Sequence, residues 1–155
     1  MSVAASWEKI VLGGTVLTME PGSAPLPNGA VAVADGCIAA VGPAEELLEM
    51  APPGDVVTAT NCVILPGLVN THSHLAMTLL RGLADDLPLQ DWLEHHIWPA
   101  EKAHMNRDAV RLGTQLAAAE QLLAGVTTTT DMYFFGDEVA SVLAEIGMRG
   151  VVAES

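Results

Sequence analysis

The chain has 155 residues, of which 50% are hydrophobic and 16% are charged. This length suggests about one domain, and this composition excludes a disordered chain because it supplies enough apolar surface for a core. With 19 acidic and 6 basic side chains the formal net charge is −13, which argues against a broad basic patch for nucleic acid or an anionic membrane.

The first part of the chain is expected to be rich in β-structure. Strands are predicted at 9–19, 30–34, 37–41, 56–57 and 63–65, with a short helix at 45–50. Asp35-Gly36 lies between two of the apolar runs and supplies the positive φ that a tight hairpin turn demands. Gly13-Gly14 interrupts the first strand.

After Pro66 the pattern changes to an alternation of strands and helices. Strands are predicted at 67–71, 126–131 and 150–154, helices after Asn106 and Asp137, and a long irregular and helical stretch from Leu75 to His104. Such a βαβαβ order is typical of a parallel sheet or of a β/α barrel. The sequence therefore predicts an α/β fold.

The two helices of this alternation have recognisable ends. Asn106 is the predicted N-cap of a helix that reaches Ala124, and Gly125 follows as a C′ glycine. Spacings of three and four residues predict one buried stripe on this helix, made of Ala109, Leu112, Leu116, Ala119 and Leu123. Asp137 is the predicted cap of the next helix, which ends at Gly147 and turns inward Val139, Leu143 and Ile146.

The sequence shows no targeting or membrane segment. No apolar run reaches the roughly 18 residues of a membrane span, and the first residues lack a basic segment followed by an apolar core. Cys37 and Cys62 lie in separate strand-like segments, which favours reduced thiols over a disulfide. We therefore expect a cytoplasmic protein with a small-molecule partner and with no nucleic acid or membrane partner, and a homo-oligomer is compatible with the sequence.

His72 and His74 stand where the first strand after Pro66 meets its following loop. A strand points residues i and i+2 to the same face, so both imidazoles can bind one metal ion. Zinc and similar ions take histidine nitrogen and carboxylate oxygen, and catalytic sites leave one position for water. Polar loop chemistry is the alternative explanation. The metal explanation gains from position, because active sites of β/α barrels lie at the C-terminal ends of the strands.

Other candidates in this half have simpler explanations. Glu101 follows Pro99-Ala100 at a predicted helix start, where an acidic side chain favours the helix dipole. Asp131 closes the second strand of this half, where it either acts at the catalytic face or orients loops. We expect His95, His96 and His104 on helix surfaces, surface ion pairs for Arg81, Asp85 and Asp86, and core positions for Trp92 and Trp98.

The run Pro-Gly-Leu-Val-Asn-Thr-His-Ser-His at 66–74 resembles the first barrel strand of the amidohydrolase superfamily. The continuation at 77–101, with 125–133 and 147–149, is similar to the chlorohydrolase and aminohydrolase branch, near the 5-methylthioadenosine/S-adenosylhomocysteine deaminases. The resemblance covers essentially the whole chain. It implies a metal-dependent β/α (TIM-type) barrel with one divalent metal, zinc before iron, beside a small β-sandwich domain. Residues 1–65 would be the N-terminal portion of that β-domain, and 66–155 the first three β/α units of an incomplete barrel.

The resemblance also implies roles for residues. His72 and His74 match the first two metal ligands, and Glu101 matches a carboxylate that holds the ribose hydroxyls of a nucleoside. A carboxylate suits two vicinal hydroxyls because it can accept two hydrogen bonds at once. Glu154 stands where some nucleoside deaminases are expected to carry an arginine, which disfavours S-adenosylhomocysteine as the substrate.

The implied reaction is hydrolytic deamination of an adenosine-like nucleoside or a purine-like substrate, in which metal-activated water attacks the carbon bearing the amine. The catalytic acid/base group and the remaining ligands are expected downstream of Ser155. A β/α barrel usually needs about 250 residues and eight strands, so we expect this chain to be an inactive fragment of a longer deaminase. Two alternatives stay open: a guanine or cytosine deaminase or a triazine-type chlorohydrolase of the same branch, and a stand-alone, non-catalytic α/β module.

Overall fold

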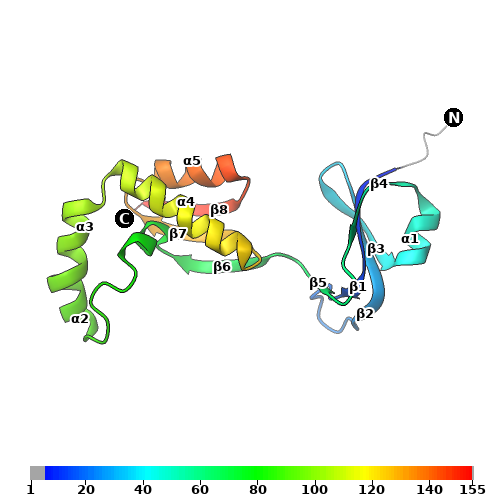
Figure 1. The fold of residues 1–155 in the computed structure, drawn as a ribbon, viewed down its shortest axis with the longest axis horizontal. Helices are drawn as coiled ribbons and strands as arrows, with labels where there is room; N and C mark the ends of the chain where they lie inside the picture. Colours follow the sequence, from blue (N-terminus) through cyan, green and yellow to red (C-terminus); the bar gives the residue numbers. More distant parts are fainter. Residues whose placement is uncertain (1–5, 155) are drawn as a thin grey trace. The chain divides into compact units, whose positions relative to one another are not determined.

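The computed structural model describes residues 6–154 of the chain. The chain divides between Pro66 and Gly67 into two compact units. Each unit has its own sheet (Figure 1) and its own hydrophobic core. The mixture of helices and strands is that of an α/β protein.

The first unit consists of one five-stranded sheet and one helix. Its elements are β1 (Trp7–Val16), β2 (Leu26–Ala34), β3 (Cys37–Pro43), α1 (Ala44–Met50), β4 (Pro53–Thr58) and β5 (Val63–Ile64). The strand order is β3-β2-β1-β4, and β5 pairs with the end of β1. The predicted hairpin is confirmed: Asp35 and Gly36 join β2 to β3 with φ values of 51° and 69°. At Gly13-Gly14 the pairing of β1 with β2 is irregular.

The helix α1 covers one face of this sheet. The core between them consists of Trp7, Ile10, Ala30, Ala32, Leu47 and Ala51, and the Trp7 indole Nε1–H donates to the Leu47 carbonyl at 2.9 Å. Strand residues alternate between faces, so Val11 and Val31, next to the buried Ile10 and Ala32, lie on the other face. There they line an open apolar groove of about 300 Å³.

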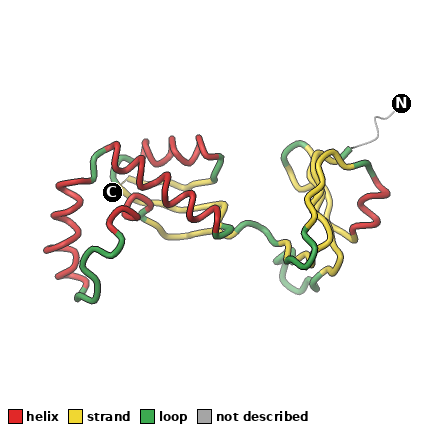
Figure 2. Tube along the Cα trace, viewed as in Figure 1, coloured by secondary structure: helices red, strands yellow, loops and turns green. Residues whose placement is uncertain are grey.

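The second unit is a three-stranded parallel sheet with helices. Its elements are β6 (Leu68–Ser73), the 3₁₀ helix η1 (Leu75–Leu80), α2 (Leu89–Trp92), the π-helix η2 (Leu93–Ile97), α3 (Trp98–His104), α4 (Arg107–Leu123), β7 (Val126–Tyr133), α5 (Gly136–Ile146) and β8 (Arg149–Glu154). The strand order is β6-β7-β8 with parallel pairing, and α4 and α5 lie side by side along the sheet (Figure 2). The predicted βαβαβ order is confirmed.

The helix α4 begins as predicted but buries a different stripe. The Asn106 side chain caps it by accepting from the Ala109 amide at 3.0 Å. The predicted stripe was wrong, because Leu112, Leu116 and Leu123 are 58%, 43% and 91% exposed. The buried residues are the neighbouring small ones, Val110, Gly113, Thr114, Ala117 and Ala118. Small side chains let α4 lie close to η1: a Cβ added at Gly113 would lie 2.5 Å from the Ala76 carbonyl oxygen.

The helix α5 also differs at its start. Its N-cap residue is Phe135, with φ 54°, whereas the predicted cap Asp137 lies inside the first turn. There Asp137 and Glu138 pair with Arg107 of α4 at 2.7 and 3.1 Å, so the acidic residues join two helices. The inner face carries Val139, Val142 and Leu143, while Ile146 is 39% exposed.

Two further expectations concern the surface. Cys37 and Cys62 are exposed and free, in agreement with the expectation of reduced thiols. Between residues 6 and 154, none of the helices is both long and apolar enough to cross a membrane.

Candidate active site

The two histidines lie at the C-terminal end of β6. His72 is the penultimate residue of the strand, and His74 follows it directly. Their rings are 5.2 Å apart between centroids and nearly perpendicular. Between them, Ser73 points to the other face, where its hydroxyl donates to the Thr130 carbonyl at 2.7 Å. The strand end is thus fixed to β7 by Ser73 and presents both imidazoles on one side.

The ring of His74 is oriented by the backbone of β7. Its Nδ1 lies 2.6 Å from the carbonyl oxygen of Met132. A carbonyl oxygen can only accept, so Nδ1 carries a proton, and in the neutral ring Nε2 then has a free lone pair. Metal-binding histidines commonly donate their second ring N–H to a carbonyl or carboxylate in this way. The tautomer of His74 is therefore one that can bind a metal through Nε2.

Asp131 holds the turn that follows His74. Its carboxylate oxygen Oδ1 accepts from the Leu75 amide at 2.6 Å, and the residue is 1% exposed. Burial raises the pKa of Asp131, and the hydrogen bond from the Leu75 amide opposes this shift. Asp131 thus orients the start of η1, and it does not line the neighbouring cavity.

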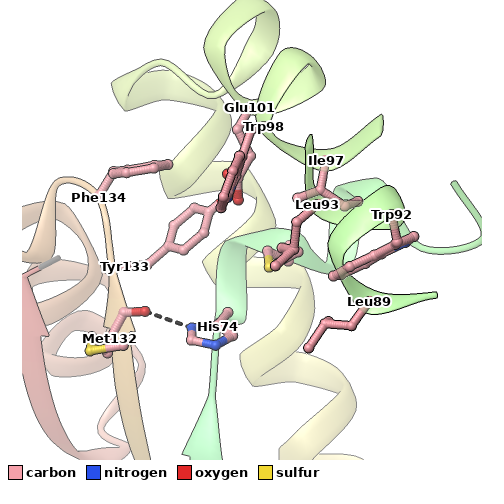
Figure 3. A pocket seen from close by; sticks show the side chains of 11 residues that line it. His74, Leu89, Trp92, Leu93, Ile97, Trp98, Glu101, Met132, Tyr133 and Phe134 are labelled. Carbon is pink, nitrogen blue, oxygen red and sulfur yellow. Dashed lines mark hydrogen bonds between the residues drawn. The ribbon is translucent and has the colours of Figure 1, made fainter. Parts of the chain in front are cut away.

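A cavity of about 450 Å³ lies beside His74 (Figure 3). Its polar lining groups are His74, Glu101 and Tyr133. The other walls are aliphatic and aromatic, and they include Met77, Leu89, Trp92, Ile97, Trp98 and Phe134. An apolar cavity with a few convergent polar groups is the usual form of a small-molecule site.

One continuous helical run supplies most of these walls. The backbone stays helical from Leu89 to His104 through the π-helix η2, with φ −75° and ψ −56° at Ile97. Glu101 lies in the first turn of α3, as expected, but this turn continues η2 and is not a free helix start. Trp92 and Trp98 were expected in the core, but both line the cavity and Trp98 is 50% exposed. A π segment changes the side-chain spacing within a helix, and such segments are frequent at functional sites.

The carboxylate of Glu101 is held by Tyr133. The Tyr133 hydroxyl donates to Glu101 Oε1 at 2.7 Å, and the two residues are 4% and 9% exposed. Burial and the Glu101 carboxylate both raise the pKa of Tyr133. Sequence reasoning did not identify Tyr133 as a site residue. The available signal was its place at the end of β7, two residues after Asp131 and hence on the same face of the strand.

A second cavity of about 430 Å³ adjoins the first. Trp98, Glu101 and Phe134 line both cavities, and Lys102, Met105, Phe135 and Glu154 complete the second. Glu101 is thus accessible from both cavities. Glu154, at the end of β8, contributes a second carboxylate to the lining of this cavity.

The remaining candidates lie outside these cavities. His95 is exposed and pairs with Asp91 at 2.9 Å, and Arg81 pairs with Glu120 rather than with Asp85 or Asp86. Within residues 6–154 no group of three or more His, Cys, Asp or Glu side chains could hold a metal ion. The candidate donors at the strand end are two imidazoles, which suit zinc or iron and leave further positions to other ligands.

Two models of known protein families match the chain. The model of the amidohydrolase family matches residues 63–154. The model of an imidazolonepropionase-like composite domain from bacteria matches residues 29–52.

Relatives with curated names include deaminases of adenosine-type compounds. A 5-methylthioadenosine/S-adenosylhomocysteine deaminase from Syntrophobacter fumaroxidans is 50% identical over 145 residues, which are 94% of this chain and 33% of that protein. A 5'-deoxyadenosine deaminase from Methanosarcina barkeri is 47% identical over 140 residues, 90% of this chain and 31% of that protein. The chain thus spans about a third of the length of the curated relatives it matches.

A solved structure has the same fold. The adenosine deaminase from Xanthomonas campestris with bound zinc superposes with a TM-score of 0.92 at 42% identity. The match covers 94% of this chain and 33% of that one.

Proposed function

The chain belongs to the amidohydrolase family, and from this premise we propose that the protein expressed from its complete reading frame, hereafter the complete protein, hydrolytically deaminates an adenosine-like nucleoside. The observation that carries the proposal is that His74 and Glu101, which are 27 positions apart, line one apolar cavity. One residue can bind a metal and the other can accept hydrogen bonds from hydroxyl groups. The names of the relatives support the adenosine-like substrate class.

His72 and His74 would hold the divalent metal, zinc first and iron as the alternative. When bound, such a metal lowers the pKa of a water molecule toward neutrality and so supplies the hydroxide for hydrolysis. The tautomer fixed by the Met132 carbonyl supports this role, because it leaves Nε2 of His74 free. Further ligands and the group that transfers protons are proposed to lie beyond Ser155.

Glu101 would bind the ribose of the nucleoside. Its carboxylate can accept hydrogen bonds from two vicinal hydroxyls. Trp92, Trp98 and Phe134 would cover the planar rings and exclude water, because aromatic side chains combine large apolar area with defined geometry. The 5′ end of the substrate would enter the second cavity. Glu154 there would disfavour the carboxylate of S-adenosylhomocysteine relative to neutral 5′ groups.

The finer architecture is part of the same proposal. Residues 66–155 would be the first three β/α units of an incomplete TIM-type barrel. Residues 1–65 would be the N-terminal portion of a small β-sandwich domain. The three parallel strands and the family match over 63–154 support this assignment. We also propose that the complete protein is cytoplasmic.

The assay measures deamination by the purified complete protein in the presence of zinc. The readouts are the release of ammonia and the change in ultraviolet absorbance of the adenine ring. We expect turnover of adenosine, 5′-deoxyadenosine and 5-methylthioadenosine. His72→Ala and His74→Ala should each lose at least about 100-fold in activity, because each removes a metal ligand. His95→Ala is the matched control, since His95 is exposed and lies outside the cavity.

Full activity of His74→Ala would refute the ligand assignment. Turnover of guanine, cytosine or a triazine without turnover of any adenosine compound would instead favour the other enzymes of this branch.

A further inference from the structure

We propose that Tyr133 is a positioning residue: its hydroxyl fixes the Glu101 carboxylate so that the ribose hydroxyls of a bound nucleoside meet an acceptor already in place. This inference rests on the proposed function, because it takes Glu101 as the group that binds ribose. Tyr133 itself would act through Glu101 and would not touch the reacting atoms.

Tyr133 stands between the two functional groups of the cavity. Its ring centroid lies 6.2 Å from that of His74 and 4.8 Å from that of Phe134. Its hydroxyl points away from His74 toward the carboxylate of Glu101, as Figure 3 shows. The ring therefore forms the wall between the metal-binding end and the carboxylate, and the hydroxyl reaches the carboxylate from that wall.

The carboxylate of Glu101 is incompletely satisfied without a ligand. A carboxylate offers about four acceptor positions. In the described part of the chain, its side chain accepts one hydrogen bond, from Tyr133, and forms no ion pair. A carboxylate that is 9% exposed normally needs more partners than one neutral hydroxyl. Because Glu101 lines both cavities, its remaining acceptor positions are available to a molecule bound there.

The placement of Tyr133 ties this carboxylate to the rest of the site. Three consecutive residues at the end of β7 each hold one part of the site. Asp131 holds the start of η1, and the Met132 carbonyl orients the ring of His74. Tyr133 holds the carboxylate of Glu101. One strand end therefore sets the position of Glu101 relative to His74. Preset geometry of this kind lowers the cost of binding, because less freedom is lost when the ligand arrives.

The test is Tyr133→Phe in the complete protein, which deletes the hydroxyl and keeps the ring. We expect the KM for adenosine to rise about tenfold, the usual effect of losing a hydrogen bond to a charged group, while kcat changes by less than about twofold. The KM for 2′,3′-dideoxyadenosine, which lacks both hydroxyls, should not change. Calorimetric titration of the metal-free protein with both nucleosides measures the same difference without turnover.

Two further variants complete the design. Glu101→Gln should reduce the preference for adenosine over the dideoxy compound at least as much as Tyr133→Phe. Ser141→Ala is the matched control, because it deletes another hydroxyl–carboxylate bond, from Ser141 to Glu145 at 3.2 Å on α5, outside both cavities. It should leave both KM values unchanged.

The outcomes separate the two proposals. Equal loss for both nucleosides in Tyr133→Phe, or no loss for either, would overturn the positioning role even where Glu101→Gln behaves as expected. An unchanged nucleoside preference in Glu101→Gln would overturn the ribose role of Glu101, and the positioning role with it. Failure of the wild-type protein to bind or deaminate any adenosine compound would overturn the proposed function.

Discussion

At the scale of single residues, the end of β7 combines three kinds of contact. Asp131 uses a side-chain carboxylate, Met132 a main-chain carbonyl and Tyr133 a side-chain hydroxyl. Only the contacts of Asp131 and Tyr133 depend on residue type. The side chain of Met132 is 48% exposed, so position 132 can change while its carbonyl still orients His74.

The buried hydroxyl of Tyr133 makes stability depend on pH at the alkaline end. Burial and Glu101 raise the pKa of Tyr133 above its ordinary value, which is about 10. Above that pH the unfolded state loses the proton while the folded state keeps it. The free energy of unfolding should therefore fall as pH rises, by at most about 1.4 kcal/mol per pH unit from this group. Urea denaturation of this chain from about pH 9 to about pH 11 measures the slope.

Tyr133→Phe removes the titrating group and should show a shallower slope. The comparison is clean because Tyr133 is the only tyrosine among the 155 residues. Identical pH dependence in both proteins would show that the hydroxyl is not held in its protonated form by the fold.

Part of the candidate site could be predicted from the sequence at this scale. The shared face of His72 and His74 follows from the two-residue period of a strand. The hydrogen bond between Tyr133 and Glu101 could not be predicted from such a period, because it joins residues 32 positions apart on a strand and a helix. The tautomer of His74 could not be predicted either, since it depends on a carbonyl of another strand.

At the scale of elements, the contact between α4 and η1 connects packing to the site. The backbone of Ala76, two residues after His74, lies against Gly113 of α4. The absence of a side chain at Gly113 permits this approach, and the approach places η1 and the end of β6.

Gly113→Ala should therefore disturb both stability and the site. The added Cβ would lie 2.5 Å from one backbone atom of Ala76 and 2.9 Å from another, so η1 or α4 must move. We expect a loss of about 1–3 kcal/mol or more in the free energy of unfolding. Thermal and urea denaturation measure it. Gln115→Ala, at an exposed position of the same helix, should leave the free energy of unfolding unchanged. Equal stability of the two variants would contradict the tight contact.

The buried face of α4 shows why helix faces are hard to predict. The large residues Leu112, Leu116 and Leu123 are periodic, and so are the small residues beside them. A single sequence shows both stripes, and only the close approach of η1 selects the small one. The predicted N-cap of α5 was wrong for a related reason. Asp137 is a good capping residue, but its carboxylate pairs with Arg107 of another helix.

At the scale of the whole molecule, several apolar surfaces are open. The first unit has the groove beside Val11 and Val31, and the second has the leucines of α4 and the strand residues Leu68 and Val69, 49% and 59% exposed. The change of pattern at Pro66 predicted two regions, because a β-rich segment gives way there to alternating strands and helices. What covers these surfaces could not be predicted, because a single sequence does not show which surfaces pack together.

The proposed ligand pair, His72 and His74, predicts weak metal binding by the 155-residue chain. Two imidazoles leave most coordination positions to water, so zinc should fall below one equivalent after dialysis. Elemental analysis of the dialysed chain measures this, and the double variant His72→Ala/His74→Ala gives the background. Tight binding of one equivalent would contradict a site with only these two ligands.

The four threonines of β7, Thr127 to Thr130, have a consequence for folding fidelity. If β7 slipped by one residue, threonine would replace threonine at three of these four positions, so these residues oppose the error only weakly. The correct register is selected by Asp131, Met132 and Tyr133, because a slip would break all three of their contacts together. Correct strand alignment and assembly of the site therefore depend on the same contacts. A chain that pairs β7 wrongly also fails to bring His74 and Glu101 together.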